Sequence, residues 1–263
     1  MLNVLDFPAR KRARLPLSMV TCYDYTLARV LDGTAVDCLL VGDSVAMVMH
    51  GHPSTVHADV DMMALHTRAV VRGAPRKFVV ADMPFLAARK GLVPAMDAVQ
   101  ALMQSGAHAV KIEGARGELD LIAHIVESGV PVMGHLGLTP QSVHALGGHR
   151  VQGREDASAA RIRDDARALQ DAGCFALVLE CVPMALSRQI SEALTIPTIG
   201  IGAGPHTDGQ VLVLQDLLGL STSFKPKFVR HFADGATLVA DAVGRFHDEV
   251  GARSYPRCNE SYA

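Results

Sequence analysis

The sequence predicts a single (β/α)8 barrel of the TIM type, an α/β fold, and three observations lead to that prediction. The chain has 263 residues, and a barrel of this type needs roughly 250 residues. One pattern repeats along it: a short apolar run, a polar or glycine-containing turn, and an amphipathic stretch at helical spacing. The apolar runs are almost uninterrupted, which is typical of parallel strands buried on both faces.

Eight apolar runs are the predicted strands. They cover residues 18–23, 38–42, 78–82, 109–113, 131–135, 176–180, 198–202 and 210–214. Helices are expected between them, at residues 60–72, 94–105, 118–128, 157–172, 183–194 and 235–250. Glycines at positions 106, 129 and 173 follow three of these helices, as expected for helix ends.

No linker, charge block or low-complexity tract divides the chain, so one domain is expected over residues 1–263. A short N-terminal extension precedes its first strand, and residues 254–263 are expected to form a frayed tail. The last predicted helix is expected to close the barrel. The long connection at residues 139–156 contains three glycines, and loops of that length inside a compact domain are usually functional or mobile.

Composition excludes several classes of function. Hydrophobic residues make up 49% of the chain, charged residues make up 20%, and the formal net charge is -2, as in an ordinary globular protein. Nothing provides a basic field for nucleic acid or for a membrane surface. The basic run at residues 10–14 is expected to be a solvated N-terminal segment. No apolar run is long enough to span a bilayer.

The five cysteines form no CxxC pair, and no signal peptide precedes them. Both features indicate free thiols in a reducing cytoplasm.

Ionisable residues gather where the predicted strands end. Asp43 follows the second strand, Asp82 ends the third, and His135 and Glu180 end the fifth and sixth. Because the carboxyl ends of all strands in such a barrel open onto one mouth, these side chains should converge there. Packing alone does not explain this pattern, since burying unpaired charge is costly.

A hard divalent cation is the predicted occupant of this mouth. Asp43 and Asp82 offer two carboxylates, which suit Mg²⁺ because that ion keeps several waters and prefers oxygen ligands. Glu113 is a third candidate ligand, bound directly or through water. The alternative for a single aspartate at a strand end is a helix cap or loop anchor. Zinc is disfavoured, because the sequence has no HExxH motif and no paired Cys and His spacing.

Three further residues have predicted roles in substrate chemistry. Lys111 lies two positions before Glu113 on one strand, so both side chains should point to the same side. Its ammonium suits a substrate carboxylate or an enolate oxygen, and the alternative is a buried ion pair with Glu113. Glu180 is the predicted base, because a dry carboxylate can acquire a pKa near neutrality. His135 either orients the substrate, shuttles a proton or is structural.

A set of motifs extends from about residue 15 to about residue 250 and carries a family resemblance. They include TCYDY at 21–25, LVGDS at 40–44, ADMPF at 81–85, VKIEG at 110–114, GHLGLTPQS at 134–142, LECVP at 179–183 and IGIGAG at 199–204. The chain resembles the ketopantoate hydroxymethyltransferase family, and the block at 134–142 is the most specific of these motifs. Residues 45–47 and 221–227 depart from the usual family pattern.

The resemblance implies a (β/α)8 barrel that uses Mg²⁺ and 5,10-methylenetetrahydrofolate to convert 3-methyl-2-oxobutanoate into 2-dehydropantoate, towards pantothenate. It implies metal binding by Asp43, Asp82 and Glu113. Ser44, Asp82 and Lys111 would contact substrate, and Glu180 would accept the proton. Asp43 and His135 are also predicted to bind substrate. Members of the family form decamers, so a homodecamer is implied.

Two rival interpretations remain at this stage. One is another carbanion-forming barrel, such as a relative of phosphoenolpyruvate mutase or isocitrate lyase, but the Lys-x-Cys-Gly-His motif is missing. The other is a catalytically inactive barrel that acts as a sensor or scaffold. Loss of Asp43, Asp82 or Glu180 would favour it, and all three residues are present.

Overall fold

Eight parallel strands form a closed barrel, in chain order, in the computed structural model, which describes residues 2–221 and 226–262. The strands are β1 Leu17–Thr21, β2 Cys38–Val41, β3 Phe78–Asp82, β4 Ala109–Glu113, β5 Val132–Gly137, β6 Ala176–Glu180, β7 Thr198–Ile201 and β8 Gly209–Leu212. Pairing of β1 with β8 closes the ring. The predicted fold class is confirmed, and three strands have the predicted bounds.

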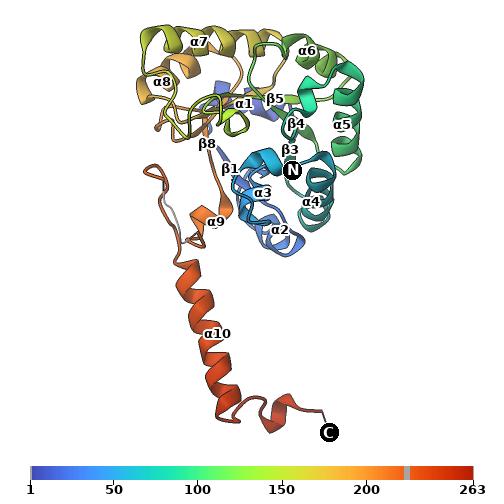
Figure 1. Cartoon of the computed structure of the whole chain (residues 1–263), viewed down its shortest axis with the longest axis vertical. Helices are drawn as coiled ribbons and strands as arrows, with labels where there is room; N and C mark the ends of the chain where they lie inside the picture. The colour runs from blue at the N-terminus through green and yellow to red at the C-terminus, as the bar shows by residue number, and fades with distance from the viewer. Residues whose placement is uncertain (1, 222–225, 263) are drawn as a thin grey trace. The chain divides into compact units, whose positions relative to one another are not determined.

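Helices lie around the outside of the strands (Figure 1). They are α1 Asp6–Ala13, α2 Tyr25–Asp32, α3 Val45–Val48, α4 Val60–Gly73, α5 Leu92–Gln104, α6 Leu119–Glu127, α7 Asp156–Asp171 and α8 Met184–Ala193. Short 3-10 turns, η1 Thr55–His57, η2 Ala87–Arg89 and η3 Pro140–Ser142, occur in the connections. The predicted helices between strands are confirmed to within two residues at each end. Helices α1, α2 and α3 were not predicted.

Helix α1 closes the floor of the barrel, at the amino ends of the strands. Its Phe7 is fully buried and packs against Phe78 and Phe175, with ring centroids 5.1 and 4.9 Å away. The same apolar cluster contains Leu17 and Cys38, which are the first residues of β1 and β2. Phe7 therefore anchors the helix just before the basic run, whereas residues 12–14 of the run are exposed, as expected.

Two cations of the basic run also have specific partners. Lys11 Nζ lies 2.8 Å from Asp208 Oδ2 and 2.7 Å from the carbonyl oxygen of Ser191. Arg10 Nη1 lies 2.6 Å from Asp37 Oδ1. These contacts tie α1 to the segments that precede β2 and β8, so the run has a structural role.

The chain divides into two compact units, Met1–Leu212 and Val213–Ala263. The second unit contains α9 Leu214–Leu217, α10 Gly235–Gly251 and a 3-10 turn, η4 Cys258–Glu260. Helix α10 matches the predicted helix at residues 235–250, and Asp234 caps it by accepting a hydrogen bond from the Thr237 amide. Packing of this helix on the barrel, the single domain and the frayed tail stay predictions. Most of the divergent segment 221–227 lies outside the described residues.

The length and hydrophobicity of the helices decide whether any of them could span a membrane. Within residues 2–221 and 226–262, none is both long enough and apolar enough to cross a bilayer.

Replacement of Phe7 by alanine should destabilise the barrel, because it leaves a cavity inside the aromatic cluster. We expect Phe7→Ala to lower the free energy of unfolding by about 3–5 kcal/mol in urea denaturation. Leu5→Ala is the matched control, since Leu5 precedes the same helix and is 74% exposed. Equal effects of the two substitutions would mean that α1 does not seal the floor.

Candidate active site

The strand-end residues predicted from the sequence do converge at the mouth. The register of the parallel strands places Asp82 beside Lys111, Glu113 beside His135, and Glu180 beside Gly137. The side chains of Asp82, Lys111 and His135 are 3–4% exposed, and that of Glu180 is 16% exposed. The cluster is thus deeply buried, and Glu180 is its most accessible carboxylate.

Lys111 is held between an acid and an imidazole. Its Nζ lies 3.1 Å from Asp82 Oδ1 and 3.1 Å from His135 Nδ1. Burial lowers the pKa of Lys111, but the carboxylates of Asp82, Glu113 and Asp43 raise it more, so the side chain stays a cation. The alternative of an ion pair with Glu113 alone is wrong, because the closest carboxylate is that of Asp82.

His135 bridges the remaining two acids. Its Nδ1 lies 3.4 Å from Glu113 Oε1, and its Nε2 lies 3.3 Å from Glu180 Oε2. Burial and Lys111 lower the pKa of His135, whereas hydrogen bonds to Glu113 and Glu180 raise it, with a net result of about 9. As an imidazolium the ring donates to both acids. The contact with Lys111 is a hydrogen bond only in the neutral tautomer with its proton on Nε2.

Asp43 completes the acid cluster from the end of β2. Its backbone amide donates to Asp82 Oδ2 at 3.0 Å, which fixes the two carboxylates side by side. Burial, then the negative charges of Glu113 and Asp82, raise the pKa of Asp43 well above its usual range. Burial also raises the pKa of Asp82, although Lys111 opposes that shift. For Glu113, the hydrogen bond and charge of His135 outweigh burial and lower the pKa.

Gln141 is a site residue to which the sequence analysis gave no role. Its side-chain nitrogen donates to Asp43 Oδ2 at 2.8 Å and to the Met83 carbonyl at 2.9 Å. Its backbone amide donates to Glu113 Oε2 at 3.1 Å. It lies in η3, within the block at 134–142, so a neutral polar residue in that specific motif was the available signal.

Ser44 stands at the edge of the site and is oriented by a buried tyrosine. Its Oγ lies 2.7 Å from the hydroxyl of Tyr23, which has no solvent exposure. The ring of His66 holds the backbone of this tyrosine, with Nδ1 donating to its carbonyl oxygen at 2.5 Å. The Ser44 hydroxyl is therefore fixed at the rim, beside Asp43.

The backbone at the end of β6 fixes the position of Glu180. The Glu180 carbonyl accepts a hydrogen bond from the Leu138 amide. Gly137 adopts a φ of +94°, and a Cβ at that position would collide with the same carbonyl. Only glycine allows this close approach, so β5 and β6 can bring His135 and Glu180 together.

The acids at the mouth fit a divalent cation. Four carboxylates, those of Asp43, Asp82, Glu113 and Glu180, surround two cationic groups. Burial and the neighbouring carboxylates of Glu113 and Asp82 raise the pKa of Asp43, so a cation beside it would stabilise its ionised form. Asp82 Oδ1 and Glu113 Oε1 contact Lys111 and His135 as ion pairs, at 3.1 and 3.4 Å, but neither oxygen accepts a hydrogen bond of good geometry within residues 2–221 and 226–262. Within residues 2–221 and 226–262, this cluster included, no three His, Cys, Asp or Glu side chains form a ready-made metal site. Two carboxylates with water therefore suit Mg²⁺ better than a closed protein cage.

Comparison with solved structures identifies other proteins with a similar fold. Phosphonopyruvate hydrolase, solved with oxalate and Mg²⁺, is 11% identical with a TM-score of 0.62, over 99% of this chain and 93% of that chain. A 2,3-dimethylmalate lyase of the phosphoenolpyruvate mutase and isocitrate lyase superfamily is 14% identical with a TM-score of 0.60, over 100% and 93%. At such low identity the likeness concerns the barrel alone.

Comparison of sequences is more specific. The family model for ketopantoate hydroxymethyltransferase matches residues 1–258. A 3-methyl-2-oxobutanoate hydroxymethyltransferase of Bdellovibrio bacteriovorus is 55% identical over 263 residues, all of both chains. One from Francisella tularensis is 50% identical over 262 residues, which is 100% of this chain and 99% of the relative. One from Coxiella burnetii is 53% identical over 256 residues, or 97% and 96%. The chain belongs to the ketopantoate hydroxymethyltransferase family.

Proposed function

We propose that this protein is an enzyme that transfers a hydroxymethyl group from 5,10-methylenetetrahydrofolate to 3-methyl-2-oxobutanoate, giving 2-dehydropantoate in pantothenate biosynthesis. Membership of the family supports the activity. The observation that carries the chemistry is the Glu180 carboxylate, which stands at the accessible edge of a buried acid cluster, 3.3 Å from His135. A base beside a cation-binding site is what the removal of a proton next to a carbonyl requires.

Mg²⁺ is the proposed metal, and Asp43 and Asp82 are its proposed protein ligands. Glu113 already accepts from Gln141 and contacts His135, so a bridging water suits it better than direct coordination. When bound, the cation polarises the carbonyl of the keto acid and stabilises negative charge on its oxygen. The chain's own contribution is to hold the two aspartates together through the amide of Asp43.

Glu180 is the proposed base for the hydrogen on C3 of the keto acid. That C–H bond breaks, its proton passes to a Glu180 oxygen, and the electron pair enters the enolate. The enolate carbon then forms a bond to the one-carbon unit supplied by the folate as one of that unit's two C–N bonds breaks. Water provides the hydroxyl oxygen as the second C–N bond breaks. The two folate nitrogens take up the proton from Glu180 and one proton from water, and tetrahydrofolate leaves. His135 Nε2 orients the Glu180 carboxylate from 3.3 Å away.

Lys111 and Ser44 are the proposed substrate-binding groups beside the base. The ammonium of Lys111 is fixed by its ion pair with Asp82, so it can meet a substrate carboxylate or enolate oxygen without reorganising. Ser44 presents a hydroxyl whose direction Tyr23 sets. His135 belongs to the substrate-binding set as well, through the orientation of its neighbours.

The loop at residues 139–156 is the proposed lid. Gln141, near its start, is anchored to Asp43 and Glu113, whereas most residues from 144 to 151 are exposed. Closure of this loop would exclude water until the new carbon–carbon bond forms. We further propose that the enzyme works as a homodecamer in the cytoplasm, as the family resemblance implies.

Replacement of Glu180 by glutamine should abolish carbanion formation, because an amide cannot accept the proton. With 3-methyl-2-oxobutanoate and Mg²⁺ in D₂O, NMR should show the C3 proton exchanging in the unmodified enzyme. We expect Glu180→Gln to slow that exchange at least ~100-fold, and His135→Asn to retain measurable exchange. Full exchange in Glu180→Gln would place the base elsewhere, and no exchange in the unmodified protein would favour an inactive barrel.

Removal of the divalent cation should lower both activity and thermal stability, since a ligand that binds only the folded state raises its melting temperature. We expect Mg²⁺ with keto acid to raise the melting temperature of the unmodified enzyme but not that of Asp43→Asn. The control is Asp61→Asn, on the exposed face of α4, which should respond like the unmodified enzyme. A normal rise in Asp43→Asn would remove Asp43 from the ligand set.

Closure of the loop should be visible as slower hydrogen exchange of its backbone amides. We expect saturating keto acid and Mg²⁺ to slow exchange in peptides from residues 143–152, while peptides from α4 stay unchanged. Identical exchange with and without these ligands would exclude the loop as a lid.

A further inference from the structure

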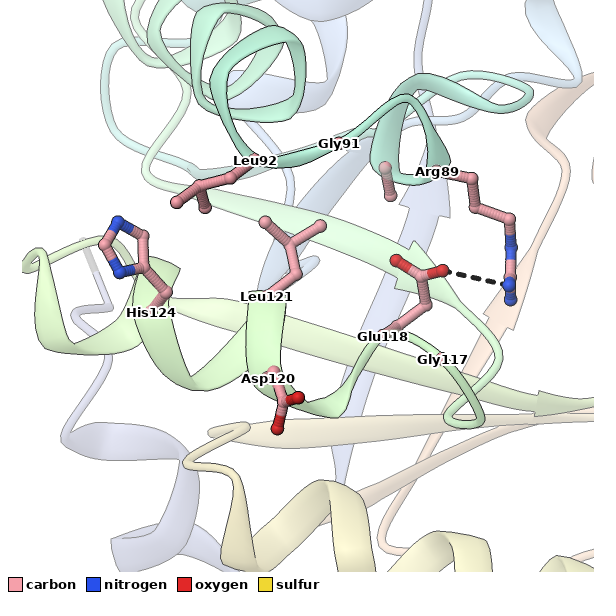
Figure 2. A pocket seen from close by; sticks show the side chains of 9 residues that line it. Arg89, Gly91, Leu92, Gly117, Glu118, Asp120, Leu121 and His124 are labelled. Atoms are coloured by element: carbon pink, nitrogen blue, oxygen red, sulfur yellow. Dashed lines mark ion pairs between the residues drawn. The ribbon is translucent and has the colours of Figure 1, made fainter.

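A cavity of about 480 Å³ lies beside the mouth, between the start of α5 and the start of α6. Figure 2 shows its lining, with Leu92 and Leu121 on opposite sides and the ion pair of Arg89 and Glu118 at one end. None of these residues has a role in the proposed mechanism. The cavity therefore needs its own explanation.

Glu118 is a buried carboxylate, and only one of its two oxygens has a partner among the described residues. Its side chain is 2% exposed, and Oε1 pairs with Arg89 Nη1 at 3.0 Å. Oε2 points the other way in Figure 2 and has no hydrogen-bond partner within the described part of the chain. An unsatisfied buried acceptor is costly. Glu118 precedes α6 but makes no capping hydrogen bond, so helix capping does not account for it.

The cavity adjoins the active site. A second cavity, of about 120 Å³, is also lined by Arg89 and reaches Glu113 and Gln141. Arg89 therefore stands between the two spaces. The turn before α6 makes room for it, because a Cβ at Gly117 would lie only 3.3 Å from Arg89 Nη1. The two cavities share Arg89 as a lining residue, and Glu118 lines the larger cavity while Glu113 lines the smaller one.

The charges of the residues that line the larger cavity indicate which kind of ligand group it can bind. Arg89 is already paired with Glu118, and Asp120 adds a second negative charge at the rim. An anionic group would therefore meet an excess of carboxylate. A neutral ring with N–H donors would satisfy Glu118 Oε2, while the side chains of Leu92 and Leu121 would cover its faces.

We propose that this cavity binds the pterin ring of the folate co-substrate, with Glu118 Oε2 accepting hydrogen bonds from the ring's paired N–H donors. The inference rests on the proposed function, which requires a folate. A pterin carries a ring N–H beside an amino group, and because Arg89 already occupies Glu118 Oε1, these donors meet Oε2 as a single charge-assisted acceptor. The one-carbon unit then lies on the side of Arg89 that leads towards Glu113.

Binding requires a small adjustment of the cavity wall, because less than 1 Å² of Glu118 Oε2 is accessible to water. Burial raises the pKa of Glu118, and the positive charge of Arg89 opposes that rise. Glu118 is thus a binding residue for the co-substrate, separate from the groups that act on the keto acid.

Titration calorimetry with tetrahydrofolate tests the carboxylate. We expect Glu118→Gln to weaken binding roughly 10- to 100-fold, because the amide replaces an acceptor with a donor that faces the donors of the ring. Glu127→Gln is the matched control, since it makes the same change at an exposed position at the other end of α6, outside the cavity lining, and should change affinity less than about twofold. Equal affinities of Glu118→Gln and the unmodified protein would overturn the proposal.

Two further measurements do not depend on the folding of Glu118→Gln. Leu121→Trp fills the cavity without altering the ion pair and should weaken tetrahydrofolate binding, whereas unaltered binding would contradict the assignment. In the unmodified protein, tetrahydrofolate or 6-methyltetrahydropterin should slow amide hydrogen exchange at residues 117–124. Protection by p-aminobenzoylglutamate instead would assign the cavity to the tail of the folate and overturn the pterin assignment.

Deuterium exchange into the keto acid separates failure of this inference from failure of the proposed function, since that exchange uses no folate. Normal exchange in Glu118→Gln with weakened folate binding is the expected pair of results. Lost exchange in the unmodified protein would instead remove the function on which the inference rests.

Discussion

Burial of four carboxylates around Lys111 and His135 is the constraint on which the mouth of this barrel depends. Lys111 touches Asp82 on one side and His135 on the other, so one ammonium links strands β3, β4 and β5. Burial, together with the negative charges of Glu113 and Asp82, raises the pKa of Asp43, so added positive charge would stabilise its carboxylate. The mouth of the barrel therefore has an excess of negative charge, which a divalent cation and an ionisable substrate could offset together.

The register of the parallel strands determines which of these charged side chains are neighbours. Neighbouring strands place Asp82 next to Lys111 and Glu113 next to His135, while Gly137 lets β6 bring Glu180 into reach. Loops then add the groups that strands cannot supply. Gln141 does so at the acid cluster, and the turn that carries Glu118 does so at the adjoining cavity. The site thus combines a rigid ring of charges with connections that are free to adapt.

The charged residues of the mouth could be predicted from the sequence because they lie in or directly after apolar runs. Asp82 and Glu180 end β3 and β6, and Lys111 lies on β4, as that pattern predicted. The specific block at 134–142 contains Gln141, but its contacts could not be predicted, since its partners lie 28 to 98 residues away and a loop contact leaves no periodic trace. Helix α1 was missed because charged residues surround its single buried anchor, Phe7. Local patterns reveal which face of an element is buried, whereas pairings across the barrel depend on the complete fold.

The floor of the barrel has a consequence for the order in which the chain can assemble. Lys11 pairs with Asp208, 197 residues later, and Phe7 packs on rings at positions 78 and 175. At ribosomal speeds of roughly 5–20 residues per second, the partner of Lys11 is made about 10–40 s after Lys11 itself. During that interval the apolar anchor of α1 has no complete cavity to enter. The first helix to be synthesised is therefore among the last to dock, and a growing chain must keep Phe7 from other apolar surfaces until β8 exists.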